Sequence, residues 1–175
     1  MRYLFLAGLS ILIAASGCNK DDDPSPRELL TGQWRMTSKT VTYAAAGYTI
    51  NQDPYASLSD CKKDDITQYN SDGSWNVDEG SSTCTPSAPQ TIPMGSWSID
   101  ESTNMMSLVA GTGSVSNLTI SELNGSTLKT TQTESLPLAG LGSILTLLLG
   151  GTAPPVGVPL PTDASITTVS TYTRQ

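Results

Sequence analysis

The sequence of 175 residues contains no histidine. A Ser-His-Asp triad, a cysteine activated by histidine and a metal site built on imidazole are therefore all excluded. Catalysis by carboxylates stays open, but Asp and Glu side chains on an acidic surface are in most cases simply solvated. We expect a protein that is not an enzyme, with no catalytic residue, no cofactor and no metal.

Basic residues are scarce as well. Nine Lys and Arg face 16 Asp and Glu, which gives a formal charge of −7. This balance favours solubility and opposes binding to nucleic acid. Aromatic residues are also few, since a single Phe, Phe5, accompanies three Trp and six Tyr. The length and apolar content fit one globular domain.

The apolar run at the N-terminus, residues 4–15, is too short for a membrane-spanning helix, which needs about 20 residues. It follows Arg2 and leads through small residues into Cys18, which is the order of a secretory signal. Ala15-Ser16-Gly17-Cys18 resembles the lipobox of bacterial lipoproteins. The resemblance implies a signal peptide over residues 1–17 and acyl chains such as palmitate on Cys18. A plain secretory signal is the alternative.

Residues 18–28 are expected to form a flexible tether, because they are acidic, contain proline and have almost no apolar side chain. Lys20 followed by acidic residues also resembles the surface-export signal of lipoproteins in some Gram-negative phyla. The resemblance implies an outer-membrane lipid anchor with the domain on the cell surface. A periplasm-facing anchor is the alternative. In both cases the membrane is a partner through the N-terminal lipid.

Two cysteines remain once Cys18 is assigned to the lipid. In an oxidising compartment, Cys61 and Cys84 are expected to form a structural disulfide. A redox pair or two free thiols are the alternatives, although redox pairs usually have Cys-x-x-Cys spacing.

The pattern of the remaining chain predicts β-strands. Apolar side chains recur at a spacing of two, as in Gly95, Trp97 and Ile99, and Asp72-Gly73 and Asn124-Gly125 are hairpin turn signals. The segment over 44–60 is expected to be a loop. Eight strands are predicted: 32–43, 64–70, 74–78, 92–100, 105–110, 115–123, 126–134 and 166–174. Short connections favour an all-β, antiparallel, eight-stranded up-and-down barrel.

The ends of this domain carry a family resemblance. Leu30-Thr31-Gly32-Gln33-Trp34 and the terminal Tyr172-Thr173-Arg174 resemble the first and last strands of lipocalins. With Gly95-Ser96-Trp97, the mature domain over 29–175 is similar to the lipocalin-like domains of bacterial lipoproteins. The resemblance implies that Gly32, Trp34 and Arg174 close the barrel, with the guanidinium on the indole.

An apolar insert over 136–161 departs from that resemblance. It has no charged residue, and Leu138, Leu141, Leu145 and Leu148 follow a helical spacing before a Pro-rich end. We expect a short helix within 137–149 that covers one end of the barrel. An exposed patch for a partner or the membrane, and a lid over a ligand cavity, are the alternatives.

The function predicted from these features is that of a membrane-anchored, non-enzymatic binding module for a small apolar ligand. The candidate ligand or cap residues are Trp75, Trp97 and the four leucines of the insert. The alternative is an accessory envelope lipoprotein that works through contacts with other proteins and holds no internal ligand.

Overall fold

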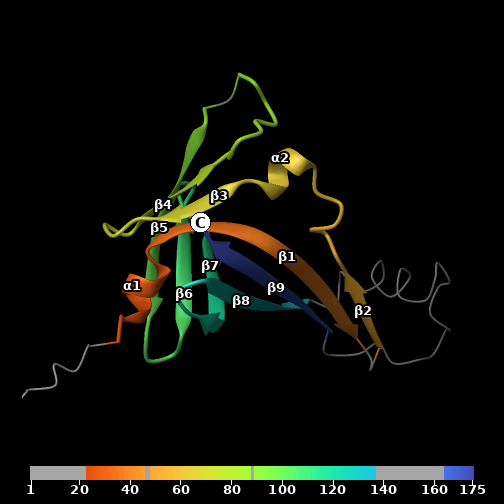
Figure 1. Cartoon of the computed structure of the whole chain (residues 1–175). Coiled ribbons are helices and arrows are strands. Elements are labelled where there is room, and N and C mark those ends of the chain that lie inside the picture. Colours follow the sequence, from red (N-terminus) through yellow and green to blue (C-terminus); the bar gives the residue numbers. More distant parts are fainter. Residues whose placement is uncertain (1–22, 46–47, 88, 137–163) are drawn as a thin grey trace, which may run out of the picture.

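The structure is a computed structural model that describes residues 23–45, 48–87, 89–136 and 164–175. Nearly all of the described secondary structure is β (Figure 1). The strands are β1 (Gly32–Ala45), β2 (Tyr48–Gln52), β3 (Ile66–Tyr69), β4 (Ser74–Asp78), β5 (Thr91–Asp100), β6 (Met105–Ala110), β7 (Val115–Leu123), β8 (Thr127–Leu136) and β9 (Ala164–Arg174). Two short helices, α1 (Pro26–Leu30) and α2 (Asp60–Lys63), complete the described elements.

Eight of these strands form a closed antiparallel barrel, as predicted. The order is β1-β3-β4-β5-β6-β7-β8-β9, and β9 returns to pair with β1 from Trp34↔Arg174 to Ala45↔Ala164. All eight strands expected from the sequence are present. The eight-stranded antiparallel barrel predicted from the sequence pattern is therefore confirmed.

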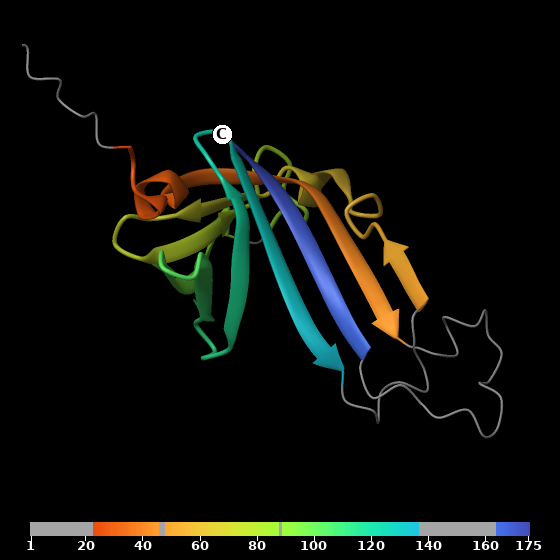
Figure 2. The ribbon, with the colours of Figure 1, turned by 90° about the horizontal axis from the view of Figure 1, so that it is seen from below.

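Strand β2 was not expected, because residues 44–60 were predicted to be a loop. It pairs with the second half of β1, from Val41↔Gln52 to Ala45↔Tyr48. The prediction was wrong here because the Ala-rich, Gly-containing sequence before β2 resembles a loop, while β1 continues far enough to template a hairpin. Figure 2 shows β8, β9, β1 and β2 side by side as one long curved sheet.

The core fills the end of the barrel at which β1 begins and β9 ends. Its buried members are Leu30, Trp34, Tyr69, Trp97, Met106 and Leu128. Tyr69 meets Trp97 edge to face, with ring centroids 5.7 Å apart. Because aromatic side chains each bury 150–250 Å², three rings of this size fill most of this end of the barrel, which we call the solid end.

Helix α1 plugs that solid end. Ser25 and Glu28 form a capping box, in which each side chain accepts a hydrogen bond from the other residue's backbone N–H. Leu30 is completely buried in the core, and the Arg27 guanidinium lies 4.8 Å from the centre of the Trp97 ring. The tether was expected to extend to residue 28, but the helix begins at Pro26 because Ser25, Pro26 and Glu28 together form a helix start.

Bulges in β1 and β7 affect which side chains face the lumen. In β1 the pairing with β9 shifts between Met36 and Ser38, so that Trp34, Met36 and Lys39 all face inward although their spacing changes from even to odd. In β7 the shift between Ile120 and Glu122 acts in the same way. A strict spacing of two would have turned Lys39 outward.

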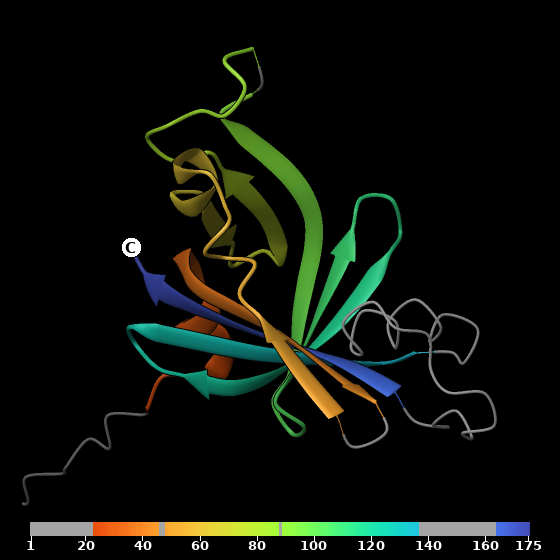
Figure 3. The same cartoon turned by 90° about the vertical axis from the view of Figure 1, so that its right-hand side faces the viewer.

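The barrel wall has two places where neighbouring strands separate. Strand β1 pairs with β3 only over Gly32–Arg35, and β7 pairs with β8 only over Thr119–Leu123. The β6–β7 hairpin and β8 visibly diverge in Figure 3. The half of the barrel beyond these pairings therefore has less strand pairing than the solid half.

Candidate functional site

The barrel-closing residues named from the sequence lie together. The Arg174 guanidinium is 4.6 Å from the centre of the Trp34 ring. Its Nη1 donates to the carbonyl oxygen of Thr31 at 3.0 Å, and its Nη2 donates to that of Leu29. A Cβ on Gly32 would lie 2.6 Å from Nη1, and Gly32 has φ +135°. Glycine is therefore required where the last strand crosses the first.

The predicted disulfide between Cys61 and Cys84 is present, with an S–S distance of 2.02 Å. It joins α2 to the connection between β4 and β5. Helix α2 and the segment before it lie beside the separation between β1 and β3, where Pro54, Leu58 and Lys62 line a cavity together with strand residues. The disulfide thus fixes one wall of the lumen.

Two cavities occupy the less paired half of the barrel and share three lining residues, Met36, Lys39 and Tyr172. We call the first the α2 chamber. It has a volume of about 310 Å³ and is also lined by Pro54, Leu58, Lys62, Asp65, Thr67 and Val77. We call the second the β8 chamber. It has a volume of about 190 Å³ and is also lined by Leu108, Ser116, Leu118, Thr130, Gln132, Thr168 and Ser170.

The two chambers differ in the chemistry of their walls. Leucines of β6 and β7 face hydroxyl and amide side chains of β8 and β9 across the β8 chamber. Burial raises the pKa of Tyr172, and a hydrogen bond with Ser170 acts in the opposite direction. The Tyr172 phenol therefore stays protonated at neutral pH and supplies a hydroxyl where the two chambers meet.

Charged groups gather in the α2 chamber. The Lys62 ammonium lies 3.2 Å from an Asp65 carboxylate oxygen and 3.4 Å from a Glu79 carboxylate oxygen. Hydrogen bonding to Asp65 is the main reason that the pKa of Lys62 is raised. Glu79 is only 3% exposed, so Lys62 neutralises a carboxylate that is out of water.

Trp75 and Trp97 were candidate ligand residues, and the structure corrects this. Neither lines the α2 chamber or the β8 chamber. Trp97 is a core residue that is 4% exposed, with its indole N–H donating to the Asn70 carbonyl oxygen at 3.1 Å. Trp75 packs against the same core cluster. They are not ligand residues because both side chains face inward at the solid end and fill the space that a ligand would need.

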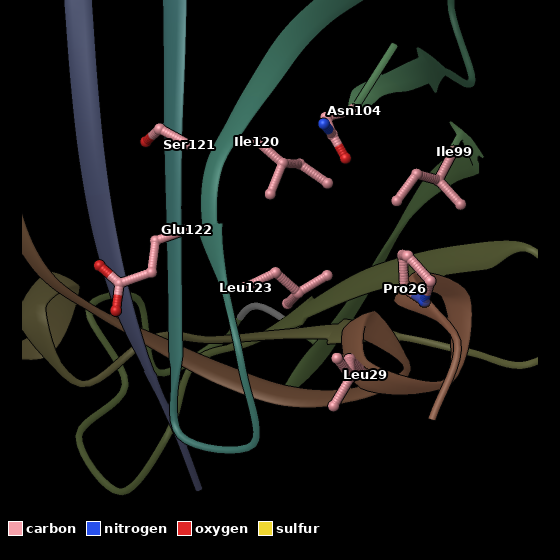
Figure 4. A pocket seen from close by; sticks show the side chains of 8 residues that line it. All are labelled: Pro26, Leu29, Ile99, Asn104, Ile120, Ser121, Glu122 and Leu123. Carbon is pink, nitrogen blue, oxygen red and sulfur yellow. The ribbon is translucent and has the colours of Figure 1, made fainter. Parts of the chain in front are cut away.

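A further cavity of about 230 Å³ lies at the solid end, between α1 and β7 (Figure 4). Side chains of Leu29, Ile99, Ile120 and Leu123 face this space, whereas those of Ser121 and Glu122 point away from it. Its lining residues are separate from those of the two chambers. We therefore do not assign the lumen ligand to this cavity.

Several predicted site residues lie outside the described residues. These are Cys18 and the insert leucines Leu138, Leu141, Leu145 and Leu148. Within the part of the chain that is described, no helix has the length and apolarity to span a membrane. The same residues hold no cluster of three or more side chains suited to a metal ion.

Sequence reasoning missed the residues that join the two chambers. Met36 and Tyr172 belong to predicted strands, but nothing in the pattern marks them as lumen residues rather than core. Lys39 is the clearest omission, because a lysine in a strand normally indicates the solvent face. Only the bulge after Met36 turns it inward, and bulges have no reliable sequence signal at this position.

Comparison with known proteins agrees with the architecture. A family model described as a lipocalin-like domain matches residues 30–130, which is more than half of the chain. The match begins at Leu30 and ends within β8, so β9 and its Arg174 lie beyond it. No curated protein and no solved structure matches the chain.

Proposed function

Because this chain belongs to the lipocalin-like domain family, we propose that it is a binding module that holds a small, largely apolar ligand inside its barrel. The observation that carries this proposal is the pair of chambers that meet at Met36, Lys39 and Tyr172. Ligand pockets in proteins usually begin at about 300 Å³, and the α2 chamber alone is about 310 Å³.

The division of the barrel supports a binding role. One half is packed with Trp34, Trp97 and Leu128 and is plugged by α1. This rigid half holds the lumen side chains of the other half in place, since the same strands continue from one into the other. A preformed cavity on a rigid support lowers the ordering cost of binding.

We include in this proposal a non-enzymatic role and a lipid anchor at Cys18. The histidine-free sequence supports the first, and the signal-like N-terminus supports the second. The anchor would hold the domain at the outer membrane, on the cell surface or facing the periplasm. Cys18→Ala should move the mature domain from the membrane fraction to the soluble fraction. Unchanged fractionation of that variant would refute the anchor without touching the ligand proposal.

The ligand proposal is tested with N-phenyl-1-naphthylamine, an uncharged apolar probe whose fluorescence rises out of water. Ser116 lines the β8 chamber, whereas its neighbour Val115 is 59% exposed. Ser116→Trp should fill the chamber and weaken probe binding at least tenfold, and Val115→Trp is the matched control. Circular dichroism spectra and melting temperatures show whether both variants fold.

Two results would overturn the proposal. The first is the absence of saturable binding to the wild-type domain. The second is an equal effect of the two Trp substitutions, which would place the probe on the surface. Either result would favour the alternative of an accessory protein that works through contacts with other proteins.

A further inference from the structure

Lys39 is the charged residue at the junction of the two chambers. It lines both chambers, together with Met36 and Tyr172. The bulge between Met36 and Ser38 is what directs it inward, and its pairing partner on β9 is Ser170. Lys39 is half-buried, whereas lysine side chains are mostly exposed, so its inward position invites a search for the group that neutralises it.

That group is not found among residues 23–45, 48–87, 89–136 and 164–175. No carboxylate in these ranges lies within 4.0 Å of the Lys39 ammonium. The ammonium also donates no hydrogen bond to any residue in the same ranges. The carboxylates of Asp65 and Glu79 both form ion pairs with Lys62 instead. Tyr172 is the other titratable group at the junction, and its raised pKa keeps it neutral.

We propose that the ligand is an amphipathic anion, with an apolar body in the lumen and one anionic group held by Lys39. This inference rests on the proposed function and specifies its ligand class. The leucines of β6 and β7 provide an apolar wall for the body, and the hydroxyls of Thr168, Ser170 and Tyr172 line the same space as the ammonium. A carboxylate or sulfonate could accept hydrogen bonds from both kinds of group.

The overall charge of the chain does not favour an anionic ligand. With a formal charge of −7, the chain as a whole repels anions. Preference for an anionic ligand must therefore arise locally, and Lys39 is the cation that both chambers share. Charge-assisted hydrogen bonds are roughly twice as strong as neutral ones, so one such contact is enough to set the preference.

The test compares two probes that share one apolar body. 8-Anilinonaphthalene-1-sulfonate differs from N-phenyl-1-naphthylamine by its sulfonate group. Dissociation constants for both probes are measured for the wild-type domain and for Lys39→Met, Lys39→Arg and Lys129→Met. Lys129 faces away from the lumen on β8 and lines neither chamber, so it controls for the loss of one positive charge.

The measured quantity is the affinity for the sulfonate probe divided by that for the neutral probe. Lys39→Met should lower this ratio about tenfold or more, which corresponds to the loss of one hydrogen bond to a charged group. Lys39→Arg should largely preserve the ratio, and Lys129→Met should leave it unchanged. An equal fall in the ratio for Lys39→Met and Lys129→Met would overturn the proposal.

Failure of the two proposals can be told apart. If the neutral probe binds in the chamber but the ratio does not depend on Lys39, the barrel binds ligands and the anion inference is wrong. If neither probe binds saturably to the wild-type domain, the proposed function fails and the anion inference fails with it.

Discussion

The Arg174 guanidinium lies over the Trp34 indole ring, 4.6 Å from its centre, and thereby joins the last strand to the first. The two residues are also register partners in the β1–β9 ladder. The indole N–H of Trp34 donates to the Leu30 carbonyl oxygen at 2.7 Å, so the same pair holds α1 in its place. The closure of the barrel between β1 and β9 and the position of α1 therefore depend on the same pair of residues.

Arg174→Met should destabilise the domain by at least about 2 kcal/mol. The substitution removes a cation–π contact worth about 0.5–2 kcal/mol, and it leaves the carbonyl oxygens of Thr31 and Leu29 without their donor. Urea denaturation followed by Trp fluorescence measures the free energy of unfolding. Gln175→Ala, at the exposed end of the chain, is the control. A change below about 0.5 kcal/mol in Arg174→Met would show that the contact contributes little.

The Cys61–Cys84 disulfide should contribute about 3.5 kcal/mol on the chain-entropy model, for a sequence separation of 23 residues. The paired variant Cys61→Ser/Cys84→Ser removes it without leaving a free thiol. Its unfolding free energy should fall by roughly that amount, and a reducing agent should destabilise the wild type but not the variant. Non-reducing peptide mapping should join the two cysteine peptides in the native protein. Two alkylatable thiols in native protein would contradict the assignment.

Stability should fall in acid. A hydrogen bond from the Ser81 hydroxyl is the main cause that lowers the pKa of Asp64, and side-chain hydrogen bonds from Gln90 and Ser102 act in the same way on Asp78 and Asp100. Because these folded-state pKa values lie below the ordinary value of 3.8, the stabilisation is complete well above that pH. It is lost as the pH falls through 3.8 toward the lowered values.

Asp64→Asn tests this pH dependence. Its unfolding free energy should depend less steeply on pH between about 5 and 2 than that of the wild type. Glu101→Gln, in the exposed turn after β5, is the matched control for the removal of one surface carboxylate. The same slope in Asp64→Asn and the wild type would show that this carboxylate does not couple folding to pH.

The insert can be removed at a position that the register defines. Leu136 and Ala164 are direct partners at the end of the β8–β9 ladder. Replacing residues 137–163 by a short Asn-Gly or Gly-Ser turn should therefore keep the barrel folded, with a native circular dichroism spectrum. If the insert covers the lumen as predicted, the same variant should lose most of its affinity for N-phenyl-1-naphthylamine.

Two outcomes of the insert experiment would contradict that prediction. Full probe affinity in the shortened protein would show that the insert is not a cap or lid. Loss of the folded state would show that it is part of the barrel. Replacing only Leu141, Leu145 and Leu148 by Ser, with the insert length retained, separates the effect of their apolar side chains from that of the connection.

Short sequence patterns and the residue composition were sufficient to predict much of this structure. Strand positions follow from side chains that alternate at a spacing of two, and hairpins follow from turn residues with special backbone preferences. The pairing of Cys61 with Cys84 followed from counting cysteines in an oxidising compartment. Gly32, Trp34 and Arg174 could be named because their short motifs resemble those of the first and last strands of lipocalins. Each of these features depends on residues that are close in sequence or few in number.

The candidate ligand site was decided only by tertiary structure. Whether Trp97 fills a core or lines a cavity depends on where along the barrel its strand is tightly paired, which is a relationship between several strands. Lys39 faces the lumen because β1 and β9 shift register after Met36, and one extra residue reverses the facing of all that follow. Strand β2 exists because β1 extends beyond its pairing with β3 and offers a free edge there. Alternation fixes the two faces of each strand, but only the pairing between distant strands fixes which face encloses the cavity.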